Sequence, residues 1–207
     1  TTAETMMQKP KGLLAMDESS PTCAKRFSAL SIPETEENRI RYRELIVTTP
    51  NLSNYISGAI LFDETFNQKM STGTLFREYL QGIGILPGIK VDAGAKDFSN
   101  HPNEKITEGL DGLRERLSEY YNLGARFTKW RAIYNISKLC PSELAIKSNA
   151  HALARYASLV QEANMVPIVE PEVLMDGEHN IDKCYEVTSK VLKECYNELV
   201  IHNVNLK

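Results

Sequence analysis

The chain has 207 residues, of which 42% are hydrophobic and 25% are charged, as in an ordinary globular protein. Its formal net charge of −3 predicts no general attraction to nucleic acid or to an anionic membrane, so any affinity for phosphate has to be local. The sequence shows no apolar secretory signal near its start and no run of the ~20 apolar residues that cross a bilayer, so we expect no membrane partner.

Five short apolar runs alternate with longer amphipathic segments. In chain order, the runs cover residues 12–16, 56–62, 86–91, 126–131 and 166–174. Their starts lie 30 to 44 residues apart, which suits strand–helix repeats rather than hairpins. This alternation predicts an α/β fold with parallel strands and right-handed crossovers, in a single domain over residues 1–207.

Capping residues predict where the intervening helices begin. Thr35 can cap one helix, with Glu36 and Glu37 in its first turn. Thr107 is predicted to cap a second and Gly124 to end it. The inward face of this second helix is predicted to carry Leu110, Leu113, Leu117 and Tyr121.

Two further helices are predicted in the last third of the chain. Ser142 can open the first of them. Its inward face is predicted to hold Leu153, Tyr156 and Val160. The second spans about residues 181–203, with Cys184, Val187, Val191 and Leu199 predicted to point inward.

The four cysteines are scattered, without a metal-binding or disulfide pattern. They are Cys23, Cys140, Cys184 and Cys195. We expect reduced thiols in a cytosol-like compartment, with Cys184 and Cys195 on one buried helix face.

Charged residues stand at or near the ends of four runs, where a covered parallel strand should be apolar. They are Asp17 and Glu18, Lys90 and Asp92, Lys129 and Arg131, and Glu170 and Glu172. Three of these pairs are two residues apart, so both members point to one face of a strand. At the mouth of a (β/α)8 barrel they would converge on a site of mixed charge suited to an anionic substrate. An internal network of ion pairs, or charges that are merely solvated, would give the same pattern.

The sequence contains no motif typical of a metal site or a nucleotide-binding site. His101, His151, His179 and His202 show neither HxH nor HExxH spacing, and no glycine-rich phosphate loop is present. We therefore expect no metal and no cofactor.

Several stretches together resemble class I fructose-bisphosphate aldolases. They are KGLLAMDES (11–19), TEENRIRYRELIVTTP (35–50), YISGAILFDET (55–65), LPGIKVD (86–92), GLDGLRER (109–116), YYNLGARFTKWRA (120–132), PSELAIKSNAHALARYA (141–157) and VPIVEPEVLMDGEH (166–179). The resemblance implies a (β/α)8 barrel of which this chain supplies roughly strands one to five. Residues 22–26 and 48–62 look closer to plastid and cyanobacterial members than to animal ones.

The resemblance also implies an activity and its residues. It implies metal-independent cleavage of fructose 1,6-bisphosphate into dihydroxyacetone phosphate and glyceraldehyde 3-phosphate, through an iminium on a lysine. Asp17 matches the carboxylate that assists carbon–carbon cleavage, and Glu170 matches the main general acid/base. Lys129 matches the cation that holds the reacting hydroxyls, and Glu172 the carboxylate that orients the lysines. Positions matching substrate and phosphate contacts are Ser19, Thr22, Arg26, Lys90 and Arg131.

The match to the family has two departures. Ser20-Pro21 stands where many relatives have Thr-Gly, so we expect an altered phosphate loop. The nucleophilic lysine of the family lies on a sixth strand, in a motif of the form TLLKP. Lys207 precedes that motif and is not this residue. We expect the protein to continue beyond it, and the 207 residues alone to be inactive.

Other functions fit the same resemblance. The chain could act as a non-catalytic scaffold that binds filaments, or belong to a related sugar-phosphate aldolase. Family resemblance further implies a homotetramer, a cytoskeletal partner as an option, and a location in the cytoplasm or the plastid stroma.

Overall fold

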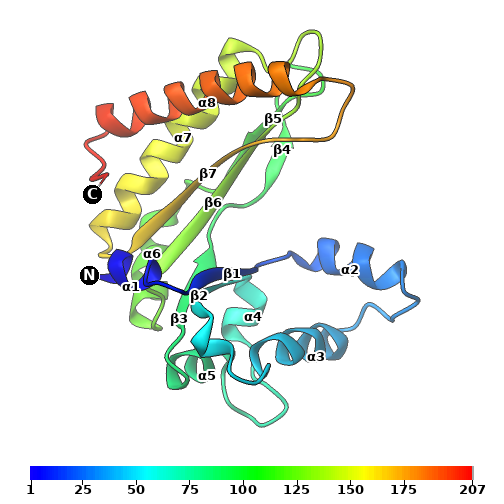
Figure 1. Ribbon diagram of the computed structural model, residues 1–207, viewed down its shortest axis with the longest axis vertical. Coiled ribbons are helices and arrows are strands. Elements are labelled where there is room, and N and C mark those ends of the chain that lie inside the picture. The colour runs from blue at the N-terminus through cyan, green and yellow to red at the C-terminus, as the bar shows by residue number, and fades with distance from the viewer. Residues whose placement is uncertain (207) are drawn as a thin grey trace. The chain divides into compact units, whose positions relative to one another are not determined.

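The computed structural model describes residues 1–206, and Lys207, with the expectation attached to it, lies outside the described residues. The elements appear in chain order in Figure 1. They are α1 (Thr2–Met6), β1 (Gly12–Met16), α2 (Ser20–Ser28), α3 (Glu36–Val47), the 3-10 turn η1 (Leu52–Asn54), β2 (Ile56–Leu61), α4 (Asp63–Asn67), α5 (Phe76–Gly82), β3 (Leu86–Lys90), β4 (Ala95–Asp97), β5 (Lys105–Thr107), α6 (Leu113–Asn122), β6 (Phe127–Tyr134), α7 (Glu143–Glu162), β7 (Val166–Val173) and α8 (Ile181–Ile201).

The five predicted strands are confirmed, each within three residues of its expected bounds. Over residues 1–206 they form one sheet in the order β1-β2-β3-β6-β7, and the β1–β2 and β2–β3 pairs are parallel. A small antiparallel hairpin of β4 and β5, which the sequence did not predict, makes a second sheet. Among the described residues, no helix is long and apolar enough to span a bilayer.

The chain divides into two compact units, each described here by itself. Unit 1 comprises Thr1–Lys90 and Tyr120–Thr128, and unit 2 comprises Val91–Glu119 and the chain from Lys129 onward. Strand β6 begins in unit 1 and continues into unit 2.

Unit 1 is built on the aligned strands β1, β2 and β3. Met16 pairs with Leu61, and Leu61 with Ile89, and all three side chains are buried. Thr35 caps α3 as predicted, since its hydroxyl accepts a hydrogen bond from the Asn38 amide at 3.2 Å. A local interaction thus sets the start of this helix.

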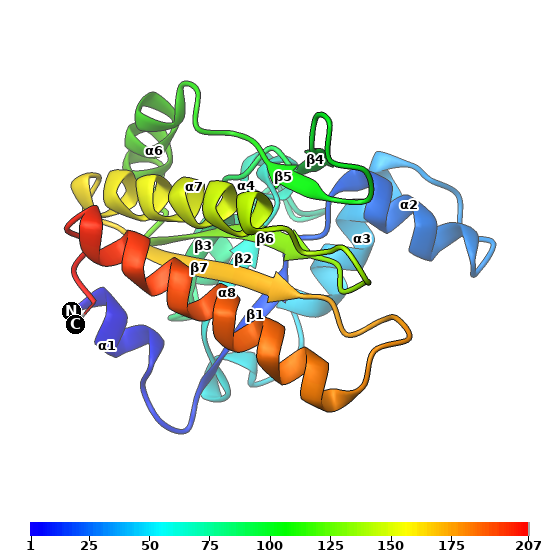
Figure 2. The ribbon, with the colours of Figure 1, turned by 90° about the horizontal axis from the view of Figure 1, so that it is seen from above.

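Unit 2 carries two long helices, α7 and α8, which lie side by side and both contact β7 (Figures 1 and 2). Ser142 caps α7 as predicted and accepts a hydrogen bond from the Ala145 amide at 3.1 Å. The predicted inward residues are buried, namely Leu153, Tyr156, Val160, Val187, Val191 and Leu199. Cys195 is buried with them, but Cys184 is only half-buried, so the shared cysteine face is confirmed in part.

The prediction that Thr107 caps a helix is wrong. Thr107 ends β5, and α6 begins only at Leu113. Tertiary hydrogen bonds hold Thr107 in the strand, because its amide donates to Asn149 Oδ1 (3.1 Å) and its hydroxyl to the Arg131 carbonyl (2.8 Å). Gly124 does follow the end of α6, with a φ of +104° that favours glycine.

Candidate active site

Four charged side chains form two cross-strand ion pairs on β6 and β7. Lys129 Nζ lies 3.0 Å from Glu170 Oε2, and the Arg131 guanidinium pairs with Glu172. The two charged residues on each strand are two positions apart, so their side chains point to the same face of that strand. The ion pairs between the strands place all four side chains on one face. All belong to unit 2, and the structure thus brings together the four residues that the sequence predicted on these strands.

These pairs are accessible to solvent to different degrees. The side chain of Lys129 is 13% exposed and that of Glu170 is 31% exposed, whereas Glu172 and Arg131 are more open. Glu170 Oε2 itself is buried and accepts no hydrogen bond from any described residue, so its contact with Lys129 is an ion pair without hydrogen-bond geometry. Within residues 1–206, no donor therefore uses the lone pairs of this carboxylate oxygen.

Asp92 contacts the backbone of Arg131, a member of the second ion pair. Its Oδ2 accepts a hydrogen bond from the Arg131 amide (3.3 Å), and its Oδ1 accepts one from the Gly94 amide (3.0 Å). Burial lowers the pKa of Arg131, but the carboxylates of Glu172, Glu170 and Asp92 outweigh burial and raise that pKa. The sequence places Asp92 among the charged residues at the strand ends, but the family resemblance gives it no role in the site.

Asp17 and Lys90 stand at the carboxyl ends of β1 and β3 in unit 1. Because Met16, Leu61 and Ile89 are aligned, the next residues, Asp17 and Lys90, stand at one level with β2 between them. Asp17 is buried and Lys90 is half-buried. The register therefore gives these two predicted residues a common face.

Glu18, a charged strand-end residue to which the family resemblance assigns no role, is the centre of a cluster in unit 1. Its carboxylate pairs with the guanidinium groups of Arg43 and Arg26, and the Tyr42 hydroxyl donates to it at 3.2 Å. Arg43, only 2% exposed, also donates to the Glu18 carbonyl at 2.6 Å and lies near Cys23 Sγ. Burial raises the pKa of Glu18, but the hydrogen bond from Arg43 and the nearby guanidinium charges outweigh it and hold that pKa below its usual range.

The predicted phosphate contacts after β1 are partly engaged with each other. Ser19 Oγ and Thr22 Oγ1 are 3.1 Å apart, and the Arg26 guanidinium is paired with Glu18. Pro21 falls in the first turn of α2, where its missing N–H and its fixed φ are tolerated. The Ser20-Pro21 departure is thus accommodated as a helix start.

Convergence of all four strand ends on one mouth stays a prediction, because the groups fall in two units. Within unit 1 the structure aligns Asp17 with Lys90, and within unit 2 it joins Lys129, Arg131, Glu170 and Glu172.

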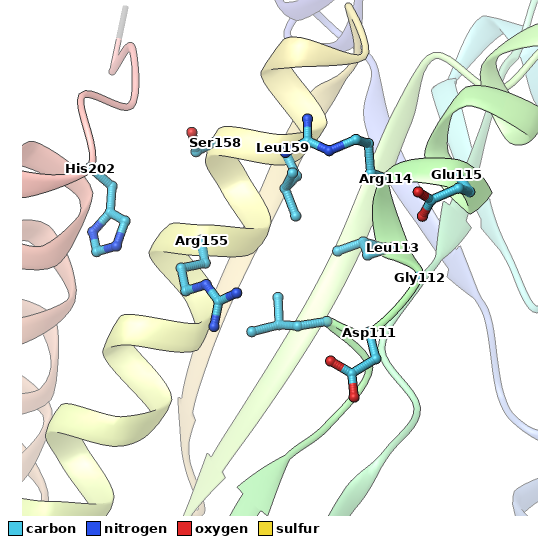
Figure 3. Close-up of a pocket in the computed structure, with 10 residues that line it drawn as sticks. Asp111, Gly112, Leu113, Arg114, Glu115, Arg155, Ser158, Leu159 and His202 are labelled. Atoms are coloured by element: carbon cyan, nitrogen blue, oxygen red, sulfur yellow. The ribbon is translucent and has the colours of Figure 1, made fainter.

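A separate pocket of about 430 Å³ lies at the start of α6 and along α7 (Figure 3). Arg155 and His202 line it, and none of the predicted site residues does. On its α8 side, His202 also meets Glu198 and His151, a cluster that the search for His motifs missed. The usable signal was the pair of Glu198 on α8 and His202, the C-cap of that helix, four residues later.

Comparison with known proteins gives the family. The family model for class I fructose-bisphosphate aldolase matches residues 1–207. A probable class 1 fructose-bisphosphate aldolase of Xanthomonas campestris is 58% identical over all of this chain and 62% of its own length. The chain therefore spans about three fifths of the length of this curated relative.

Plant relatives come from two compartments. A cytosolic fructose-bisphosphate aldolase of Arabidopsis thaliana is 51% identical over 95% of this chain and 50% of its own length. A chloroplastic one of Chlamydomonas reinhardtii is 49% identical over 98% of this chain and 54% of its own length. These identities do not single out a plastid type.

A solved structure gives the fold. A Plasmodium falciparum fructose-bisphosphate aldolase, crystallised with TRAP and an inhibitor, superposes with a TM-score of 0.93 at 48% identity. The match covers 96% of this chain and 58% of that one, and it confirms the predicted α/β class and partial (β/α)8 barrel. Sequence, fold and relatives agree, and the chain belongs to the class I fructose-bisphosphate aldolase family.

Proposed function

We propose that this protein is a class I aldolase that reversibly cleaves fructose 1,6-bisphosphate into dihydroxyacetone phosphate and glyceraldehyde 3-phosphate, without metal or cofactor. The observation that carries the proposal is the pair of cation–carboxylate contacts on β6 and β7, which present both charge signs on one face. Proton transfer beside a cationic intermediate needs such a set in one place.

Glu170 is the proposed general acid/base. In its protonated form it donates a proton to the hydroxyl of a carbinolamine, water leaves, and the nitrogen–carbon bond becomes an iminium. Oε2 can exchange this proton because it accepts no hydrogen bond from the described residues, and the Lys129 ammonium beside it stabilises the carboxylate that remains after the proton is given up. Lys129 would hold the reacting hydroxyls, and Glu172 would hold Arg131 in place.

Asp17 is the proposed carboxylate for carbon–carbon cleavage. It would take the proton of the hydroxyl that becomes the aldehyde, while the electrons of the breaking bond move to the iminium and give an enamine. Lys90 and Arg131 would bind substrate oxygens, and Ser19, Thr22 and Arg26 a phosphate, through charge-assisted hydrogen bonds. Arg26 would have to exchange its contact with Glu18 for the phosphate.

We infer that the nucleophilic lysine implied by the family resemblance lies on a sixth strand, in the part of the relatives' length that residues 1–207 do not cover. Borohydride trapping with dihydroxyacetone phosphate tests the proposal. The full-length protein should form a covalent adduct, and residues 1–207 alone should form none. If the full-length protein forms no adduct, the proposal that it is an enzyme is wrong.

A scaffold role is the second candidate. The Plasmodium relative was crystallised in complex with TRAP, so a member of this family has been captured with a partner. We propose binding to a cytoskeletal or other protein partner as the alternative if trapping fails. Pull-down of filamentous actin with the full-length protein, and with a variant that cannot be trapped, would separate this role from catalysis.

Specificity, assembly and location complete the proposal. Rates with fructose and sedoheptulose bisphosphates, compared on one preparation, would test against a related sugar-phosphate aldolase. We propose a homotetramer of single-domain barrels, to be tested by light scattering on the full-length protein. Cytosolic and chloroplastic relatives both occur, and we propose the cytoplasm.

A further inference from the structure

Three side chains of α7 and α8 meet away from the proposed active site. His151 Nδ1 lies 3.2 Å from Glu198 Oε2, and His202 Nδ1 lies 3.5 Å from the same oxygen. The two imidazole rings are in edge contact, with centroids 4.9 Å apart. One potential ligand atom from each residue lies within 4.8 Å of the other two.

These spacings are close to those of a metal coordination sphere. Around a tetrahedral ion with bonds of about 2.0–2.2 Å, neighbouring ligand atoms are roughly 3.3–3.6 Å apart. The 3.2 Å between His151 Nδ1 and Glu198 Oε2 already matches this spacing, and His202 would offer its other ring nitrogen, Nε2, because its Nδ1 faces the Glu198 carbonyl. Two imidazoles and one carboxylate form a donor set that suits Zn²⁺, Co²⁺ or Ni²⁺ better than Mg²⁺ or Ca²⁺.

The backbone of α8 favours a cation at this place. His202 is the C-cap of α8, and the last turn of that helix carries no basic residue. The carbonyl groups at a helix C-terminus form the negative end of its dipole. A divalent ion would be attracted by this end and by the Glu198 carboxylate together.

The same backbone holds the His202 ring in position. Its Nδ1 lies 2.9 Å from the Glu198 carbonyl oxygen. A proton on Nδ1, donated to that carbonyl, leaves Nε2 unprotonated, which is the form that binds a metal.

We propose that His151, Glu198 and His202 bind a divalent transition metal, best fitted by Zn²⁺, and thereby clamp α7 to α8. His151 is 53% exposed, so an ion can enter from solvent, and water would complete the coordination. His202 also borders the pocket in Figure 3. The role is structural, since none of the proposed catalytic residues takes part.

The test is a titration of the metal-free, full-length protein with Zn²⁺ by calorimetry, together with thermal unfolding. We expect one Zn²⁺ per chain at this site, a higher Tm with Zn²⁺, and reversal by a chelator. His151→Asn, Glu198→Gln and His202→Asn should each weaken binding by at least about 100-fold, since loss of even a supporting group around a metal costs about 10–100-fold. His101→Asn, outside the cluster, is the matched control and should bind as the parent does.

The visible absorption spectrum of bound Co²⁺, used in place of Zn²⁺, is a second measurement, and it can be made on the parent protein. Visible bands of tetrahedral Co²⁺ with nitrogen and oxygen ligands would support the site. A thiolate charge-transfer band, unchanged binding in the His151→Asn/His202→Asn double variant, or no stoichiometric binding would overturn it. In the last case the three side chains form a hydrogen-bonded group only.

Discussion

Glutamate paired with a basic residue occurs both in the Glu18 cluster of unit 1 and in the two ion pairs on β6 and β7 of unit 2. The two sets differ in how far the carboxylate is enclosed. Glu18 is enclosed by Arg43, Arg26 and Tyr42, and Arg43 has almost no contact with solvent. Glu170, in contrast, is partly exposed and has an oxygen that accepts no hydrogen bond from the described residues. A carboxylate whose two oxygens both accept hydrogen bonds from cations stabilises a fold, whereas one with an oxygen that accepts no hydrogen bond from the described residues can exchange protons.

The largest expected effect is on kcat and tests the proposed proton transfer by Glu170. Glu170→Gln in the full-length enzyme should lower kcat by about 10²–10⁴-fold, because the amide cannot give or take the proton. The free energy of unfolding should fall by no more than about 2 kcal/mol, since only one partner of a partly exposed ion pair loses its charge. Steady-state kinetics and urea unfolding measure the two effects, and a near-normal kcat would remove Glu170 from this role.

The next effect is on the free energy of unfolding and tests the stabilising role of the Glu18 cluster. Arg43→Met should destabilise the protein by about 3–5 kcal/mol, because it leaves the Glu18 carboxylate without its buried partner. Arg26→Met removes the other guanidinium, whose side chain is 56% exposed, and should cost at most about 1 kcal/mol. Equal losses in chemical unfolding would show that burial does not separate the two contacts.

A smaller effect compares one motif in both units. Thr35→Ala removes a helix cap that acts locally and should cost about 1 kcal/mol. Ser142→Ala removes a cap whose hydroxyl also donates to the buried Glu104 carboxylate at 2.6 Å, and it should cost about 2–3 kcal/mol. Urea unfolding of both variants gives the difference, and equal costs would mean that the Glu104 contact adds nothing.

The smallest effect is a pH dependence. The folded state holds the pKa of Glu18 below its usual range, so the stability that Glu18 contributes is present above about pH 4.3 and is lost as the pH falls toward the depressed pKa. Glu18→Gln should therefore show a shallower loss of stability below about pH 4 than the parent does. Glu37→Gln, which removes an exposed carboxylate paired with Arg41, is the control and should follow the parent curve.

The sequence by itself determined the features that depend on neighbouring residues. Strand and helix alternation, the caps Thr35 and Ser142, and the same-face placement of Lys129 with Arg131 all follow from spacing along the chain. Family motifs then carried the identity of the site residues. Each of these features is encoded by residues close together in the chain, so a local pattern is enough to reveal it.

Only the tertiary structure decided which polar groups are enclosed. Thr107 became a strand residue because Asn149, 42 positions away, accepts its amide hydrogen. Arg43 pairs with Glu18 across 25 positions, and His151 reaches Glu198 across 47. Burial and pairing over such distances depend on where other elements pack, and periodicity within one segment carries no information about them.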